Sequence, residues 1–128
     1  MKILSVDPGY ERIGIAVMEK NTSKEIILFS ECFTTSLKQK HDERLHDIGQ
    51  EIKKIIEKFS PDRLAIETLF FNTNQKTAMH VAEARGVILY EAATKKIPIF
   101  EYTPLQVKIA VTDSYGGKAY SYRKKNKI

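Results

Sequence analysis

The order of strand-like and helix-like segments is the feature that most restricts the fold of this chain. Three strand patterns come first, over Ile3–Val6, Ile13–Met18 and Ile26–Phe33. Helix patterns then alternate with two further strand patterns. Consecutive strands joined by short turns predict an antiparallel meander, and strands separated by helices predict parallel pairing. We therefore expect one α/β domain, with a mixed five-stranded sheet and helices on both of its faces.

The clearest helix pattern follows the third strand. Thr35 or Ser36 can cap a helix that begins near Leu37, and apolar residues at three- and four-residue spacing continue to Phe59. The pattern predicts an amphipathic helix that packs on the sheet.

The remaining segments complete the alternation. Arg63–Glu67 is a fourth strand, and Asn72 to Asn74 open a second helix that runs to about Lys95. Ile97–Phe100 is a fifth strand, and Pro104–Val111 a short helix.

Composition excludes several classes of protein. With 128 residues, of which 42% are hydrophobic and 29% charged, the chain can bury the core of one ordinary domain. The single cysteine, Cys32, excludes a disulfide framework, and we expect it to be a small core residue. No signal peptide is recognisable and no apolar stretch approaches the roughly 20 residues of a membrane span, so the expected location is the cytoplasm.

Charge is weak evidence for a nucleic-acid partner. Lys and Arg outnumber Asp and Glu by 21 to 16, a formal charge of +5, which favours contact with phosphates. Much of this excess lies in the last eleven positions, from Lys118 onward, so the body of the chain is nearly balanced.

Two acids stand out because each closes an otherwise apolar strand, Asp7 after Ile3–Val6 and Glu67 after Leu64–Ile66. A carboxylate there is costly to desolvate without a nearby cation. Each acid alone could lie at a solvated strand end, with Asp7 capping the turn that follows it. Together they favour a shared Mg²⁺ site. Two such ions about 4 Å apart can stabilise both reacting oxygens in phosphodiester hydrolysis.

Four motifs in order along the chain resemble the RuvC-type Holliday junction resolvases. They are Asp7-Pro8-Gly9 with Gly14; Pro61-Asp62 and Ala65-Ile66-Glu67 with Phe70, Phe71 and Asn74; Ala82-Glu83-Ala84-Arg85-Gly86-Val87; and Glu101-Tyr102-Thr103-Pro104 with Val107-Lys108 and Ala110-Val111-Thr112. The match runs from Lys2 to about Ala119.

The resemblance implies a ribonuclease-H-like fold and Mg²⁺-dependent nicking of two opposed strands of four-way junction DNA, with Mn²⁺ able to substitute. It also implies a homodimer formed through the helix around Ala78–Ala92, and it makes a branch-migration helicase complex a candidate partner.

Individual roles follow from the same resemblance. Asp7 and Glu67 would be catalytic metal ligands, and Phe70 would wedge against unstacked bases at the crossover. The alternative is that Phe70 is a core residue. Because Phe71 is adjacent, we expect one ring of the pair to face inward and the other outward. Lys108 matches a family lysine near the scissile phosphate, although a solvated helix lysine is an equal reading.

Two further residues are weaker candidates for phosphate contacts, Lys76 and Arg85. By contrast, the three histidines, His41, His46 and His80, show no metal-ligand spacing, and we expect them on helix surfaces.

The sequence departs from the family pattern near its C-terminal end. The family has two more acids on a final helix, in a His-x-x-Asp or Asp-x-x-Asp arrangement, whereas the only acid after Glu101 here is Asp113. Asp113 is predicted in a turn and is not expected to substitute. We therefore expect a resolvase domain over 1–119 with the final helix missing, and a basic, disordered tail over 120–128. A frameshift or early stop would explain this ending.

Three functions remain open on this basis. The first is a junction resolvase by descent, with weak or no nuclease activity in this chain. The second is a junction-binding protein without catalysis. The third is a nucleotide-binding fold of the actin and sugar-kinase type, which shares the Asp-x-Gly loop but needs two such domains and far more than 128 residues.

Overall fold

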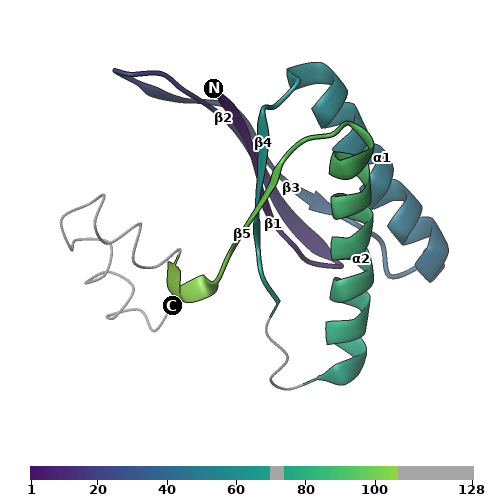
Figure 1. The fold of residues 1–128 in the computed structure, drawn as a ribbon. Helices are drawn as coiled ribbons and strands as arrows, with labels where there is room; N and C mark the ends of the chain where they lie inside the picture. Colours follow the sequence, from purple (N-terminus) through teal and green to yellow (C-terminus); the bar gives the residue numbers. More distant parts are fainter. Residues whose placement is uncertain (70–73, 107–128) are drawn as a thin grey trace.

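The computed structural model describes residues 1–69 and 74–106 of the chain (Figure 1). One sheet has the strand order β3-β2-β1-β4-β5, in which β1 to β3 are antiparallel and β4 and β5 run parallel to β1. The predicted mixed five-stranded sheet is therefore confirmed. The elements are β1 (Lys2–Asp7), β2 (Arg12–Lys20), β3 (Glu25–Thr34), α1 (His41–Phe59), β4 (Arg63–Glu67), α2 (Gln75–Thr94) and β5 (Ile99–Tyr102).

Helices α1 and α2 both pack on the same face of the sheet (Figure 1). Alternate strand residues point toward them and form a single apolar cluster with the helices, because successive strand side chains point to opposite faces. Its members are Leu4, Val6, Ile13, Ile15, Val17, Leu64 and Ile66 from the sheet, and Ile48, Ile52, Ile55, Ile56, Ala84, Ile88 and Ala92 from the helices. In residues 1–69 and 74–106, no helix is both long and apolar enough to cross a membrane.

The opposite face of the sheet carries a hollow of about 270 Å³ that Ile3, Ser5, Met18, Phe100 and Tyr102 help to line. Neither α1 nor α2 covers this face (Figure 1). The short helix predicted over Pro104–Val111 is helical at residues 104–106, and its remainder lies outside the described residues.

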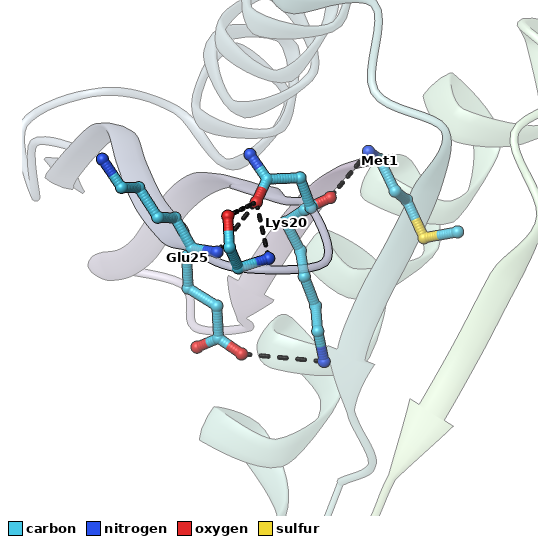
Figure 2. Close-up of polar contacts among 6 residues, drawn as sticks. Met1, Lys20 and Glu25 are labelled. Carbon is cyan, nitrogen blue, oxygen red and sulfur yellow. Dashed lines mark hydrogen bonds and ion pairs between the residues drawn. The ribbon is translucent and has the colours of Figure 1, made fainter.

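Polar residues form the turn between β2 and β3. The Asn21 side chain accepts hydrogen bonds from Lys24 N at 2.8 Å and from Ser23 N at 3.0 Å. Figure 2 shows this turn beside the N-terminus, whose Met1 amine donates to the Lys20 carbonyl at 2.9 Å. An exposed ion pair between Lys20 and Glu25, at 3.6 Å, flanks the same turn.

The predicted start of the first long helix near Leu37 was wrong, since α1 begins at His41. The Thr35 hydroxyl, predicted as a cap, instead donates to the Tyr10 carbonyl at 2.7 Å and accepts from Arg44 Nε at 3.0 Å. Both hydrogen bonds of the Thr35 hydroxyl are tertiary contacts, and Thr35 does not cap a helix.

Strand β5 begins two residues later than the pattern predicts. Ile97 N donates to the Ala92 carbonyl at 3.0 Å, and Lys96 has a left-handed backbone with φ 56°. Ile97 therefore belongs to the turn that ends α2, and pairing with β4 starts only at Ile99.

The prediction that Cys32 is a core residue was also wrong. Phe29 and Phe33 of β3 pack against the core, so alternation turns Cys32 the other way, and its side chain is exposed.

Candidate active site at the ends of β1 and β4

Asp7 and Glu67 are the last residues of adjacent parallel strands. Val6 pairs with Ile66, so the two acids follow a paired position on strands about 4.8 Å apart. Val6 and Ile66 are buried against the helices, and alternation therefore directs both acids to the opposite face. The fold thus brings the two predicted acids to one edge and one face of the sheet.

Two glycines shape the surroundings of Asp7. Gly14 pairs with Asp7 across the β1–β2 ladder, and a Cβ added to Gly14 would lie 3.4 Å from Asp7 Cβ. The missing side chain leaves space beside the carboxylate. A Cβ on Gly9 would lie 2.0 Å from the Arg12 carbonyl oxygen, so the turn that follows β1 admits only glycine there.

The turn between β1 and β2 is anchored to α1 and to the end of β3. Thr35 N donates to the Glu11 carbonyl at 3.0 Å, in addition to its hydroxyl bond to Tyr10. The guanidinium of Arg44, only 6% exposed, lies 3.9 Å from the centre of the Tyr10 ring. These contacts tie the segment after Asp7 to α1 and to the end of β3.

Arg85 of α2 makes two contacts near Glu67. Its Nε donates to the Glu67 carbonyl at 3.3 Å, and its Nη2 forms a 2.9 Å ion pair with Glu101 of β5. The Arg85 side chain is 15% exposed. Arg85 therefore links α2 to the ends of β4 and β5, and the phosphate contact predicted for it stays a prediction.

Of the other predicted DNA contacts, the structure describes only Lys76. Lys76 is exposed in the first turn of α2. Phe70, Lys108 and Asp113 lie outside the described residues, as does the segment 120–128.

The donor chemistry of Asp7 and Glu67 suits a hard cation. Carboxylate oxygens are ligands that Mg²⁺ and Mn²⁺ prefer, and Mg²⁺ usually takes one or two carboxylates and completes its shell with water and substrate phosphate. Asp7 is exposed and Glu67 is half-buried.

A cluster that the sequence reasoning missed lies where the two helices meet. His41 begins α1, and His80 and Glu83 lie one turn apart on α2. One candidate ligand atom from each of the three lies within 4.8 Å of the others. His41 and His80, which were expected on helix surfaces, are partly buried and lie together with Glu83, whereas His46 is exposed as predicted. A His-x-x-Glu spacing on a helix was the available signal.

Comparisons with known proteins agree with this architecture. The family model described as crossover junction endodeoxyribonuclease RuvC matches residues 3–122. Proteins of that name from Finegoldia magna and Halothermothrix orenii are 44% and 45% identical over 116 residues, which cover 91% of this chain and 70% of each relative.

Two solved structures share the fold. One is T. thermophilus RuvC in complex with Holliday junction substrate, with TM-score 0.79 and 29% identity over 86% of this chain and 69% of the other. The other is the yeast mitochondrial Holliday junction resolvase Ydc2, with TM-score 0.65 and 14% sequence identity. The match covers 97% of this chain and 63% of Ydc2. The latter likeness concerns the fold alone.

Proposed function

The chain belongs to the RuvC family of crossover junction endodeoxyribonucleases, and on that premise we propose that it resolves Holliday junctions by metal-dependent hydrolysis of phosphodiester bonds. The observation that carries the proposal is the placement of Asp7 and Glu67 on one face, at the ends of adjacent strands. Four-way junction DNA is the proposed substrate, with opposed strands as the points of cleavage.

Asp7 and Glu67 are the proposed catalytic metal ligands, with Mg²⁺ as the preferred ion and Mn²⁺ as a substitute. When bound, the ion supplies a Lewis acid for the phosphate oxygens and activates water for attack. Gly14 leaves room beside Asp7, and Arg85 steadies the strand end that carries Glu67. We assign Arg85 a positioning role and retain Lys76 as a candidate phosphate contact, together with Phe70 and Lys108.

Exposed residues of α2 support a homodimer formed through this helix. Met79 is 63% exposed and Tyr90 is 68% exposed, and the exposed Gly86 lies between them on the same stripe. Large apolar side chains of this kind on one helix face suit contact with a second copy of the chain.

The wider assignments are proposals of the same kind. We place the resolvase domain at 1–119 and a basic tail at 120–128, and we retain a branch-migration helicase complex as a partner. A cytoplasmic location follows from the proposed DNA substrate.

The test is a cleavage assay on a labelled synthetic four-way junction with Mg²⁺, followed by mapping of the nicks. We expect paired symmetric nicks at a low rate, because two further acids of the family have no counterpart in this sequence. Asp7→Asn and Glu67→Gln should lower that rate by roughly a further 100-fold or more, since each removes a ligand charge at the reacting phosphate. Glu57→Gln, an exposed acid of α1, is the matched control and should cleave normally.

Two outcomes would redirect the proposal. A retarded junction complex without nicks would favour the alternative, a junction-binding protein that lacks catalysis. Nicks that persist in Asp7→Asn would contradict the assignment of Asp7 as a metal ligand.

A further inference from the structure

We propose that His41, His80 and Glu83 form a second metal site, which binds Zn²⁺ or a similar transition-metal ion independently of Asp7 and Glu67. The cluster lies between α1 and α2, on the helix-covered side of the sheet, whereas the two strand-end acids belong to the other face. Imidazole nitrogens favour transition metals over Mg²⁺, so the two sites would select different ions.

The spacing of the ligand atoms fits a tetrahedral ion. Metal–ligand distances of about 2.0–2.2 Å place tetrahedral ligand atoms roughly 3.3–3.6 Å apart. His41 Nε2 and Glu83 Oε2 are already 3.2 Å apart, and the candidate atoms of all three residues lie within 4.8 Å. Glu83 is 49% exposed, so its side chain can complete the approach by a change of rotamer.

His41 is oriented in the way that metal-ligating histidines are. Its Nδ1 lies 2.5 Å from the Tyr10 hydroxyl, and its Nε2 faces Glu83. A ligating histidine almost always uses its other ring nitrogen as a hydrogen-bond donor to an oxygen, which sets the tautomer. The Nε2 contact with Glu83 is a hydrogen bond when Nε2 carries the ring proton. An ion bound at Nε2 would displace that proton, and Nδ1–H would then donate to the Tyr10 oxygen.

The second imidazole is held close to the first. The rings of His41 and His80 stack with centroids 4.5 Å apart, and the Tyr10 ring lies 4.6 Å from His80. Because an imidazole lone pair lies in the plane of its ring, the His80 ring must turn out of this stack to direct a nitrogen at the same ion as His41.

Charge sets the expected strength of the site. Two neutral imidazoles and one carboxylate leave a bound divalent ion with net charge +1, and the Arg44 guanidinium adds positive charge at 3.9 Å from the Tyr10 ring. We therefore expect moderate affinity. Three protein ligands also leave a fourth position open for water, as in other zinc sites of this stoichiometry.

The experiment is a titration of the full, untagged chain with Zn²⁺ in the absence of DNA, followed by calorimetry and by the thermal unfolding midpoint. Co²⁺ serves as the spectroscopic probe, because its visible spectrum reports four-coordination. We expect one ion per chain and a higher unfolding midpoint. Affinity should fall as the pH falls, because protons compete with the metal for imidazole.

Variants separate this site from every other. His80→Ala and Glu83→Gln should weaken Zn²⁺ binding at least 10-fold, and Tyr10→Phe should weaken it by a smaller factor, since it removes only the support of His41. His46→Ala removes the remaining histidine of the chain and should bind Zn²⁺ like the unchanged protein. Asp7→Asn should also leave Zn²⁺ binding unchanged.

The contrary results are equally clear. Zn²⁺ binding that survives in His80→Ala, or that is lost in Asp7→Asn, would overturn the proposal. Circular dichroism of each variant without metal distinguishes lost ligands from lost folding. Failure of this test would leave the proposed junction cleavage unaffected, because that activity is assigned to Asp7 and Glu67.

Discussion

Two roles are possible for Arg85: it positions the end of β4 that carries Glu67, or it contacts a DNA phosphate. A single substitution can distinguish them. Replacing Arg85 with Met keeps most of the aliphatic volume and removes both the Glu67 carbonyl bond and the Glu101 ion pair. As a positioning residue, Arg85→Met should lower the cleavage rate about 10-fold with junction affinity retained, because small misplacements of reacting groups are costly. Single-turnover kinetics and gel retardation measure the two effects.

A phosphate contact would give a different result. Loss of such a contact weakens binding to all junctions and lowers the salt dependence by about one unit of slope. Glu101→Gln is the control, since it removes the partner charge and leaves the bond from Arg85 to the Glu67 carbonyl intact.

Glu31 of β3 links stability to pH. Burial raises the pKa of its carboxyl above the ordinary value of 4.5, and a hydrogen bond and repulsion from Glu51 raise it further, while Lys54 lowers it. A raised folded-state pKa contributes stability that is present below the unfolded value and is lost as the pH rises through the folded value. Glu31→Gln should therefore be more stable than the unchanged chain at pH 7, with the difference vanishing below about pH 4.5.

Urea unfolding at several pH values measures this difference. The matched control is Glu25→Gln, an exposed acid on the same strand that pairs with Lys20 and should change stability little at any pH. An equal effect of both substitutions would contradict the role of burial at Glu31.

At the scale of elements, the two helices differ in how they use glycine. A Cβ on Gly49 of α1 would lie 3.0 Å from Val87 of α2, whereas a Cβ on Gly86 meets nothing within 4 Å among the described residues. Gly86→Ala should stabilise the monomer by about 0.5–1 kcal/mol through helix propensity. Gly49→Ala should gain less or lose stability, because its methyl group crowds the helix crossing.

Denaturant unfolding at low protein concentration is the measurement, so that association does not contribute. An equal gain from both substitutions would mean that the crossing tolerates a side chain at Gly49. Gly86 also lies on the exposed stripe of α2, so the same variant tested at high concentration reports whether close helix approach matters for a dimer.

At the scale of the whole molecule, the exposed stripe of α2 predicts the oligomeric state. Tyr90→Lys places a charge at the 68% exposed position of the proposed dimer face and should shift the chain from dimer to monomer. Leu37→Lys is the control, because Leu37 is 76% exposed but lies before α1 and outside that face. Sedimentation velocity distinguishes monomer from dimer. If the Tyr90→Lys variant remained dimeric, the interface would lie on another surface.

The arrangement of layers explains how DNA could reach the proposed site. Helices α1 and α2 cover one face of the sheet (Figure 1), and alternation along β1 and β4 directs Asp7 and Glu67 to the other face. A substrate can therefore approach the carboxylates without moving the helical layer.

Local patterns were enough to predict the sheet and its pair of acids. Alternation along β1 and β4 turns Asp7 and Glu67 away from the face that Val6 and Ile66 occupy. The antiparallel strands β2 and β3 and the helix α1 lie between β1 and β4 in the chain and return β4 to the direction of β1. The direction of each acid depends on its neighbours in the chain and follows from sequence, whereas the pairing of β1 with β4, which brings the two acids to one edge, joins distant segments. Phe70 and Lys108, which were assigned by resemblance, lie outside the described residues.

Only the tertiary structure decided the contacts between distant segments. The Thr35 hydroxyl hydrogen-bonds to Tyr10 and Arg44 and does not cap a helix. His41 lies close to His80 and Glu83 because α1 and α2 pack side by side. Such contacts depend on how two helices cross above a sheet, which no pattern within either helix encodes. Strand and helix periodicity is a property of adjacent residues, whereas a cluster drawn from two elements exists only once those elements are packed.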